Sequence, residues 1–295
     1  MNSNLTRYAW LSIAAALSTM ALKTLAWWLT GSVGLLSDAI ESLVNLAGAL
    51  MALWMLKLAA TPADVEHPHG HSKAEYFSSA FEGLLIFLAA LSIAQTALQR
   101  LLHPQALEAV GAGLVVSALA SLINLVVARI LLRVGQTQNS ITLEADAQHL
   151  MTDVWTSAGV MVGIALVLLT GWLWLDPAIA LLVAGNILFT GWQLLRRSAD
   201  GLLDAALPLA QRQQIDRVLD DFRAQGLDFD AIKTRQAGQH TFITLHVLVP
   251  GHWPVQQGHD CCENVEQVLR QNVPGAHIIT HLEPLPASAS THSGL

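Results

Sequence analysis

Six long apolar stretches occupy roughly the first two thirds of the chain. Each contains about 20 residues or more with few charges, the length that an α-helix needs to cross the hydrocarbon core of a bilayer. We predict membrane spans at 8–29, 33–56, 77–102, 110–132, 143–169 and 173–195. After Arg197 this pattern ends, and the polar and apolar positions take on shorter periods.

The remainder of the chain has the spacing of a small domain of helices and strands. Amphipathic spacing predicts helices at 209–225 and 255–271, and alternation predicts strands at 229–236, 240–249 and 276–283. This order favours a compact α+β sandwich. We therefore expect three parts: a polytopic six-helix transmembrane domain over 1–207, a small α+β domain over 208–286, and a disordered tail over 287–295.

The positions of Lys and Arg predict how the spans are oriented. Lys57 and Lys73 flank the second connection and Arg196 follows the sixth span, whereas the first and fifth connections carry no basic residue. Basic connections stay on the cytoplasmic side. We therefore expect a multi-pass protein of the cell (inner) membrane with both termini in the cytoplasm. Arg100, near the end of the third span, departs from this pattern and has to reach outward to water.

Composition agrees with a membrane protein and excludes several classes. Of the 295 residues, 53% are hydrophobic and only 13% are charged, too apolar a balance for a soluble chain of this length. The formal net charge of −7 and the lack of basic blocks argue against nucleic acid as a partner. Cys261 and Cys262 are adjacent, and adjacent cysteines rarely form a disulfide, so we expect a reducing compartment.

Two spans carry polar side chains at helical spacing. His149 and Asp153 stand at i and i+4 where the fifth span begins, and Asp38, Glu41 and Asn45 form one stripe in the second span. Ionisable groups in hydrocarbon are costly and indicate function. Two helices that each offer a pair of nitrogen or oxygen donors can close a four-ligand cage around a divalent ion. Asp38, near the outer end of its span, either joins this cage or is solvated or bonded to a neighbouring helix.

The charges of this cage favour exchange of metal for protons. Ionised Glu41 and Asp153 balance a 2+ ion while Asn45 and His149 stay neutral, but without metal the two carboxylates repel each other. We expect protons to fill the empty site. His149 titrates near physiological pH in its free form, so it is the group over which metal and proton compete. The sequence predicts metal/proton antiport by alternating access.

Several motifs together resemble one family, the cation diffusion facilitators, and in particular the bacterial zinc and ferrous-iron efflux transporters of the YiiP/FieF type. The motifs are TGSVGLLSDAIESLVN, HPHGHSKAE, EADAQHLMTD, LLDAALP, TRQAG and THLEP. The resemblance implies a six-helix membrane domain and a cytoplasmic metallochaperone-like (ferredoxin-like) domain. It also implies a homodimer that exports divalent metal by inward proton flow, a transporter and not an enzyme.

The resemblance places the transport site on Glu41, Asn45, His149 and Asp153. His149 and Asp153 match the family's HxxxD pattern, whereas this branch usually has an aspartate at the positions of Glu41 and Asn45. This difference leaves the metal and the number of protons open. Zn²⁺ is expected first and Fe²⁺ second, with Mn²⁺, Co²⁺, Ni²⁺ and Cd²⁺ open, because such ligands discriminate poorly.

The connection after the second span resembles a further metal site of the family, carried onto Asp64, His67 and His71. Its alternating histidines beside acidic residues offer enough ligands on their own account. The alternative is an incidental His-rich loop that binds metal weakly. Lys73 and Asp204 match a charge pair with which the family holds its two subunits together.

Alternation in the last domain directs ligand-type side chains away from its core. His246 lies opposite the apolar stripe of its strand, as do His281 and Glu283 on theirs. The resemblance implies a regulatory cluster for one or two ions on Asp230, His246, His259, His281 and Glu283. The alternative is a solvated polar face. Cys261 and Cys262 could join as soft ligands, although packing is the expected role.

Two other classes of function could use the same residues. A membrane metallohydrolase would hold a catalytic zinc, but no HExxH motif is present and we expect no separate general base beside the cage. A metal sensor would bind ions in its cytoplasmic domain without transport. Only a carrier moves metal against a pH gradient, and only with His149 and Asp153 intact.

Overall fold

The computed structural model describes residues 5–30, 33–103, 111–273 and 275–285. Within the helices, the side chains at positions 30, 33–38, 40–41 and 112–113 lie outside that description. The chain divides into two compact units, with the boundary between Asp200 and Gly201. The predicted tail, 287–295, lies outside the described residues.

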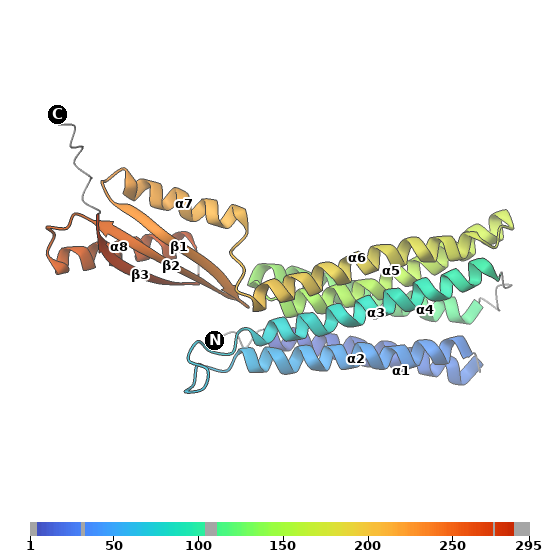
Figure 1. Cartoon of the computed structure of the whole chain (residues 1–295). Coiled ribbons are helices and arrows are strands. Elements are labelled where there is room, and N and C mark those ends of the chain that lie inside the picture. The colour runs from blue at the N-terminus through green and yellow to red at the C-terminus, as the bar shows by residue number, and fades with distance from the viewer. Residues whose placement is uncertain (1–4, 31–32, 104–110, 274, 286–295) are drawn as a thin grey trace, which may run out of the picture. The chain divides into compact units, whose positions relative to one another are not determined.

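The first unit consists of six helices that run side by side (Figure 1). They are α1 (Leu5–Thr30), α2 (Val33–Ala59), α3 (Ala74–Leu102), α4 (Gly111–Gln138), α5 (Ile141–Thr170) and α6 (Leu175–Leu202). All six are long and apolar enough to cross a membrane. The six predicted spans are confirmed, and most of the helices extend a turn or so beyond them.

Buried apolar side chains of this unit form two cores. The larger core joins α1, α2, α4 and α5 through residues such as Ile13, Leu53, Leu131 and Leu143. The smaller core, which includes Ile86, joins α3, α5 and α6. Helix α5, which carries His149 and Asp153, therefore contributes to both cores and lies where the two groups of helices meet.

The start of α5 is fixed by a carboxylate from α3. Asn139 turns the chain with φ 52°, and Ser140 at the N-cap makes no capping bond with its own side chain. Instead Ser140 Oγ donates a hydrogen bond of 2.5 Å to Glu75, whose carboxylate is also 3.5 Å from the Thr142 N–H. An acceptor at a helix N-terminus satisfies backbone donors that would otherwise be unpaired. This contact sets the position of α5 against α3.

Arg100, the basic residue that departs from the predicted charge pattern, lies at the outer end of the helix bundle. Arg100 is about half exposed, and its Nη1 lies 3.5 Å from Asp176 at the start of α6. The predicted reach toward water is therefore accompanied by an ion pair with a neighbouring helix.

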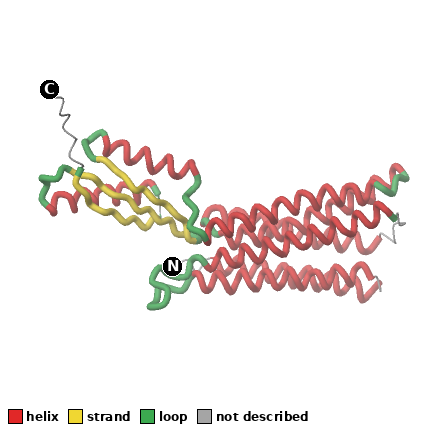
Figure 2. The backbone as a smooth tube through the Cα atoms, viewed as in Figure 1, coloured by secondary structure: helices red, strands yellow, loops and turns green. Residues whose placement is uncertain are grey.

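The second unit has the order helix, strand, strand, helix, strand. Its elements are α7 (Leu209–Arg223), β1 (Asp228–Ala237), β2 (His240–Val249), α8 (Val255–Asn272) and β3 (Ala276–Pro284). The sheet order is β1-β2-β3, with β1 antiparallel and β3 parallel to β2. The strands of this sheet are the yellow segments of the tube in Figure 2. The predicted α+β fold is confirmed. Both helices share one apolar core with the sheet, including Leu219, Leu245 and Leu269, so the opposite face of the sheet is left for polar side chains.

Candidate metal sites

Helices α2 and α5 bring three of the four predicted transport ligands together. His149 Nε2 lies 2.9 Å from Asn45 Oδ1, and Asn45 Nδ2 donates a hydrogen bond of 2.5 Å to Asp153 Oδ2. Asn45 and His149 are each only 7% exposed. Glu41 lies in α2 one turn before Asn45, but its side chain and that of Asp38 are outside the described residues.

A second amide, from α4, joins this cluster. Asn124 is 3% exposed, and its Nδ2 donates a hydrogen bond of 3.0 Å to the same oxygen of Asp153. Its Oδ1 is buried and has no hydrogen-bond partner among the described residues. This oxygen is free to face a cation. Asn124 was overlooked in the sequence because its neighbours at helical spacing on α4, Ser117 and Ser121, are not ionisable and do not by themselves mark a metal site.

A buried carboxylate from α3 stands on the other side of the imidazole. Glu82 is fully buried, and its Oε2 lies 3.1 Å from His149 Nδ1. A carboxylate can act as a base, so the expectation that no separate general base stands beside the cage is wrong. Glu82 was overlooked because it is a single acidic residue in an apolar stretch, although an acidic residue within a span is itself a signal of function.

One further acid lies in the same buried layer. Asp146 on α5 is 2% exposed, and its Oδ1 accepts a hydrogen bond of 2.9 Å from Ser12 on α1. The layer thus combines carboxylate, amide and imidazole donors and no thiolate among the described residues. Such a donor set suits an exchangeable divalent ion better than a closed structural zinc site. The buried layer also needs positive charge, because burying carboxylates without a counter-charge costs free energy.

The connection after α2 gathers its three predicted ligands. Asp64 Oδ1 accepts a hydrogen bond of 2.6 Å from the His67 N–H, and Asp64 Oδ2 lies 3.5 Å from His71 Nε2. One ligand atom from each residue lies within 4.8 Å of the others. Gly70 turns this connection at φ 77°, a conformation that suits glycine. The His67 N–H lowers the pKa of Asp64, and both imidazoles act in the same direction, so this carboxyl group is a ready anionic ligand.

The exposed face of the sheet brings together four of the five predicted cytoplasmic ligands. His246 Nδ1 lies 2.9 Å from Asp230 Oδ1 and 3.2 Å from Glu283 Oε1, and these three could hold an ion. The His281 ring lies beside them, with its centroid 5.2 Å from that of His246. The strand register explains this grouping, because Asp230 and His281 are both paired with His246.

A β-bulge supports the acidic side of that cluster. The register of β1 shifts between Asp230 and Lys233, and Ala231 has φ 46°. Bulges redirect neighbouring side chains and are common next to functional sites. Here the bulge follows Asp230 directly, at the point where its carboxylate meets His246.

The fifth predicted ligand and the two cysteines lie apart from this cluster. His259 on α8 is 61% exposed at its side chain and lies 3.4 Å from Glu263 on the same helix. Cys262 is buried in the domain core and Cys261 packs against it. Burial raises the pKa of both thiols, which keeps them protonated and agrees with a packing role.

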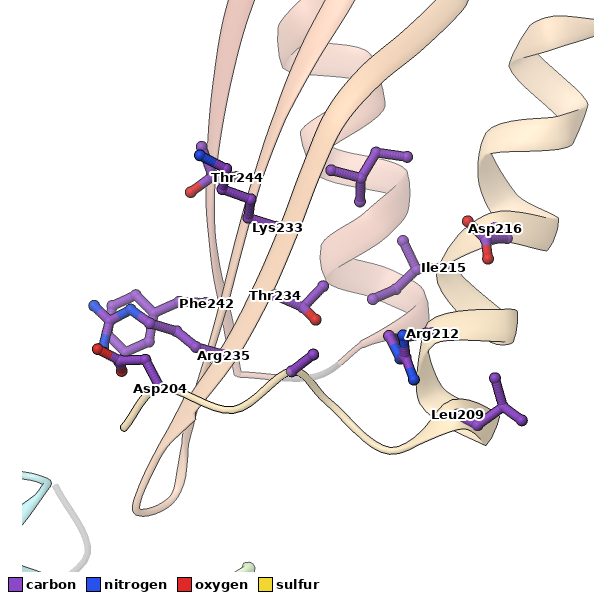
Figure 3. Close-up of a pocket in the computed structure, with 12 residues that line it drawn as sticks. Asp204, Leu209, Arg212, Ile215, Asp216, Lys233, Thr234, Arg235, Phe242 and Thr244 are labelled. Carbon is purple, nitrogen blue, oxygen red and sulfur yellow. The ribbon is translucent and has the colours of Figure 1, made fainter. Parts of the chain in front are cut away.

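Figure 3 shows a cavity of about 670 Å³ at another part of the cytoplasmic domain. Arg235 lies on one side of β1, where its Nη1 is 3.3 Å from Asp204 Oδ1 and its guanidinium is 4.0 Å from the centre of the Phe242 ring. Arg212 lies on the other side, next to Ile215 (Figure 3). The guanidinium groups of Arg235 and Arg212 therefore do not converge on one point of the cavity. Asp204 thus has a partner within its own domain, and its predicted pairing with Lys73 across subunits stays a prediction.

Comparison with known proteins identifies the family. Residues 9–203 match the cation efflux transmembrane domain, and residues 207–285 match the cytoplasmic domain of cation efflux proteins. The chain belongs to the cation diffusion facilitator family. It is therefore a multi-pass membrane transporter of divalent metal cations with a cytoplasmic C-terminal domain, and not an enzyme. This membership sets aside the membrane metallohydrolase.

Full-length relatives agree with this assignment. The chain is 56% identical over 286 residues to an uncharacterized transporter of Synechocystis sp., covering 97% of this chain and 92% of that protein. It is 31% identical over 288 residues to the cation-efflux pump FieF of Klebsiella pneumoniae, covering 98% and 95%. It is 32% identical over 285 residues to FieF of Pectobacterium carotovorum, covering 95% and 93%.

Proposed function

We propose that this cation diffusion facilitator exports a divalent transition-metal cation from the cytoplasm in exchange for protons, Zn²⁺ first and Fe²⁺ second. The observation that carries the proposal is the buried contact of Asn45, His149 and Asp153, from two helices within an apolar bundle. Mn²⁺, Co²⁺, Ni²⁺ and Cd²⁺ fit the same donor types.

In this proposal Glu41 is the fourth ligand. It precedes Asn45 by one turn of α2, so both can face one object. Glu41 and Asp153 then supply the two negative charges that a divalent cation needs. When the cation leaves, protons replace it, because two buried carboxylates without a counter-ion are strongly disfavoured.

The arrangement of the helices supports alternating access. Helix α5 contributes to both apolar cores of the membrane unit, and a displacement of one group of helices against the other would open the site to one side at a time. The ligands lie on α2 and α5, which are both in the larger core, so they can stay together during such a displacement.

The remaining parts are proposed to regulate and assemble the transporter. The loop cluster at Asp64, His67 and His71 would bind a second ion, and the sheet cluster around His246 would bind one or two more. The protein would form a homodimer, with Lys73 and Asp204 paired between subunits. We propose that it lies in the cell (inner) membrane with both termini in the cytoplasm, and that it is divided into 1–207, 208–286 and a tail at 287–295.

A metal sensor without transport is the alternative, and the sheet cluster is the observation that would favour it. A single experiment separates the two functions. The purified chain is reconstituted in proteoliposomes with a pH gradient, and Zn²⁺ uptake and proton release are followed together. We expect uptake that depends on the gradient in the native protein and none in Asp153→Ala or His149→Ala.

The matched control for that experiment is His259→Ala, which removes an exposed imidazole outside the three clusters and should transport normally. A sensor would bind Zn²⁺ without any flux in the native protein. Flux that persists unchanged in both Asp153→Ala and His149→Ala would refute the proposed transport site.

A further inference from the structure

We propose that Glu82 is a positioning residue for transport: its carboxylate orients the imidazole of His149 so that Nε2 faces the cation. The inference rests on the proposed function and names what holds its histidine ligand in place. It does not depend on which divalent ion is carried.

The two nitrogens of the His149 ring face two different helices. Nε2 lies 2.9 Å from Asn45 Oδ1 on α2, and Nδ1 lies 3.1 Å from Glu82 Oε2 on α3. Asn45 donates a hydrogen bond to Asp153, so the Nε2 side of the His149 ring faces the transport cluster. A cation that binds Nε2 leaves the proton on Nδ1, and histidine ligands in proteins commonly donate that proton to a carboxylate, which fixes the ring and its tautomer.

Glu82 is available for this role because nothing else described competes for it. Neither of its oxygens has a hydrogen-bond partner among the described residues, and Nδ1 of His149 has none either. The Glu82–His149 contact is at ion-pair distance without the alignment of a hydrogen bond. A buried acceptor and a buried donor thus lie within reach of each other.

The neighbouring helix is shaped to leave room for this carboxylate. Gly48 on α2 faces Glu82, and a Cβ at Gly48 would overlap the carboxylate atoms. On the adjacent position of α3, Gly83 lets the backbone approach Leu194 and Leu195 of α6. Helix α3 is therefore held closely on both sides at this level, which fixes where the carboxylate stands.

A second buried glutamate on α3, Glu75, has a structural role and can be compared with Glu82. Glu75 is 1% exposed and lies seven residues before Glu82, on the same face of the helix. Its Oε2 is occupied by the Ser140 hydroxyl and the Thr142 N–H. Glu82 has no such bonds and faces a transport ligand, and its charge lies in the same layer as Asp146. A position this costly is expected only where it serves function.

The test compares four full-length proteins in proteoliposomes: native, Glu82→Gln, Glu82→Leu and Glu75→Gln. Initial rates of Zn²⁺ uptake give KM and Vmax for each. Glu82→Leu removes the acceptor, so we expect KM for Zn²⁺ to rise by about 10- to 100-fold. Glu82→Gln keeps an oxygen that can accept the Nδ1 proton and should recover most of the affinity. Glu75→Gln should leave KM unchanged.

A spectroscopic measurement keeps the proposal testable if Glu82→Leu does not fold. In native protein with ¹⁵N-labelled histidine and bound Zn²⁺, we expect the His149 signal, identified by its loss in His149→Ala, to show metal on Nε2 and a proton on Nδ1. Metal on Nδ1 would overturn the proposal, as would an unchanged KM in folded Glu82→Leu. Absence of Zn²⁺ uptake by the native protein would instead overturn the proposed function itself.

Discussion

Asp153 is held more firmly than its spacing on α5 suggests. One of its oxygens accepts hydrogen bonds from two amides, Asn45 and Asn124, which come from different helices. Neutral amides orient the carboxylate without adding charge. They can also turn their oxygens toward a cation, so the site can offer oxygen ligands while its net charge stays low.

Replacing one of these amides should change which ions are preferred. Asn45→Asp adds a negative charge at a position that touches both His149 and Asp153. We expect the order of preferred ions to change, because carboxylate and amide oxygens differ in their attraction for harder and softer cations. The measurement is competition between Zn²⁺, Fe²⁺, Mn²⁺, Co²⁺, Ni²⁺ and Cd²⁺ in proteoliposomes. An identical order in the variant would show that the amide is a bystander.

The residues that could be predicted were those with a partner on their own helix. His149 and Asp153, one turn apart, are recognisable from sequence because helical spacing places them on one face. Glu82 and Asn124 have only serines beside them at helical spacing, and the partners His149 and Asp153 are brought to them by helix packing. Spacing along a chain cannot show such contacts, although a lone acidic residue in a span remains a signal.

At the level of elements, the Glu75 carboxylate of α3 serves as the N-terminal cap of α5. Ser140 and Thr142 at the start of α5 bond to Glu75 of α3, and the Thr142 hydroxyl donates to the Glu75 carbonyl at 3.2 Å. This junction fixes where α5 begins against α3.

Removing that carboxylate should destabilise the membrane unit. In Glu75→Ala the buried Ser140 hydroxyl loses its acceptor, which we expect to cost about 1–3 kcal/mol. Thermal unfolding of the detergent-solubilised protein measures the change. Glu66→Ala, at an exposed position of the connection after α2, is the control and should be neutral. Equal midpoints for the two variants would contradict this role of Glu75.

At the other end of the sheet, His240 should titrate below the ordinary range of a histidine. Partial burial lowers the pKa of His240, and the neighbouring His277, with ring centroids 5.3 Å apart, lowers it further. Because the folded pKa lies below the free value of about 6.5, protonation opposes folding. The contribution of this group to stability is therefore complete above that value and is lost as the pH falls below it.

His277→Gln should raise the pKa of His240 part of the way back toward its free value, since burial remains. An NMR titration of selectively labelled histidine in the full-length protein measures this shift. His252→Gln, at an exposed site in the β2–α8 connection, should leave His240 unchanged. A His240 pKa that does not move in His277→Gln would show that the two rings do not interact.

At the scale of the whole molecule, the length of the apolar runs and the alternation of polar and apolar residues were enough to predict the six spans and the strands. Runs of about 20 apolar residues gave six helices, and alternation gave the strands, most of whose ends the sequence placed to within a residue or two. The grouping of His246 with Asp230 was expected from the family resemblance, and the strand register and the bulge at Ala231 give its physical reason. His259 shows the converse, because a place on the helix next to the sheet does not bring it into the cluster.

Metal should stabilise the cytoplasmic domain through the sheet cluster. A ligand at 100 times its Kd stabilises the folded state by about 2.7 kcal/mol for each site. We expect Zn²⁺ to raise the thermal midpoint of the full-length protein, and Asp230→Ala to reduce that rise. His259→Ala should keep it. An equal loss in both variants would mean that α8 moves toward the cluster when metal binds.

The central claim is that one divalent cation is held inside the membrane by His149 and Asp153 together with the residues of α2. X-ray absorption at the zinc edge tests it most directly, in full-length protein whose other clusters are removed by replacing Asp64, His67, Asp230 and His246 with Ala. We expect one bound Zn²⁺ with a single imidazole, oxygen ligands and no sulfur, and loss of that zinc in His149→Ala. Zinc retained with the same spectrum after both His149 and Asp153 are replaced by Ala would contradict the account.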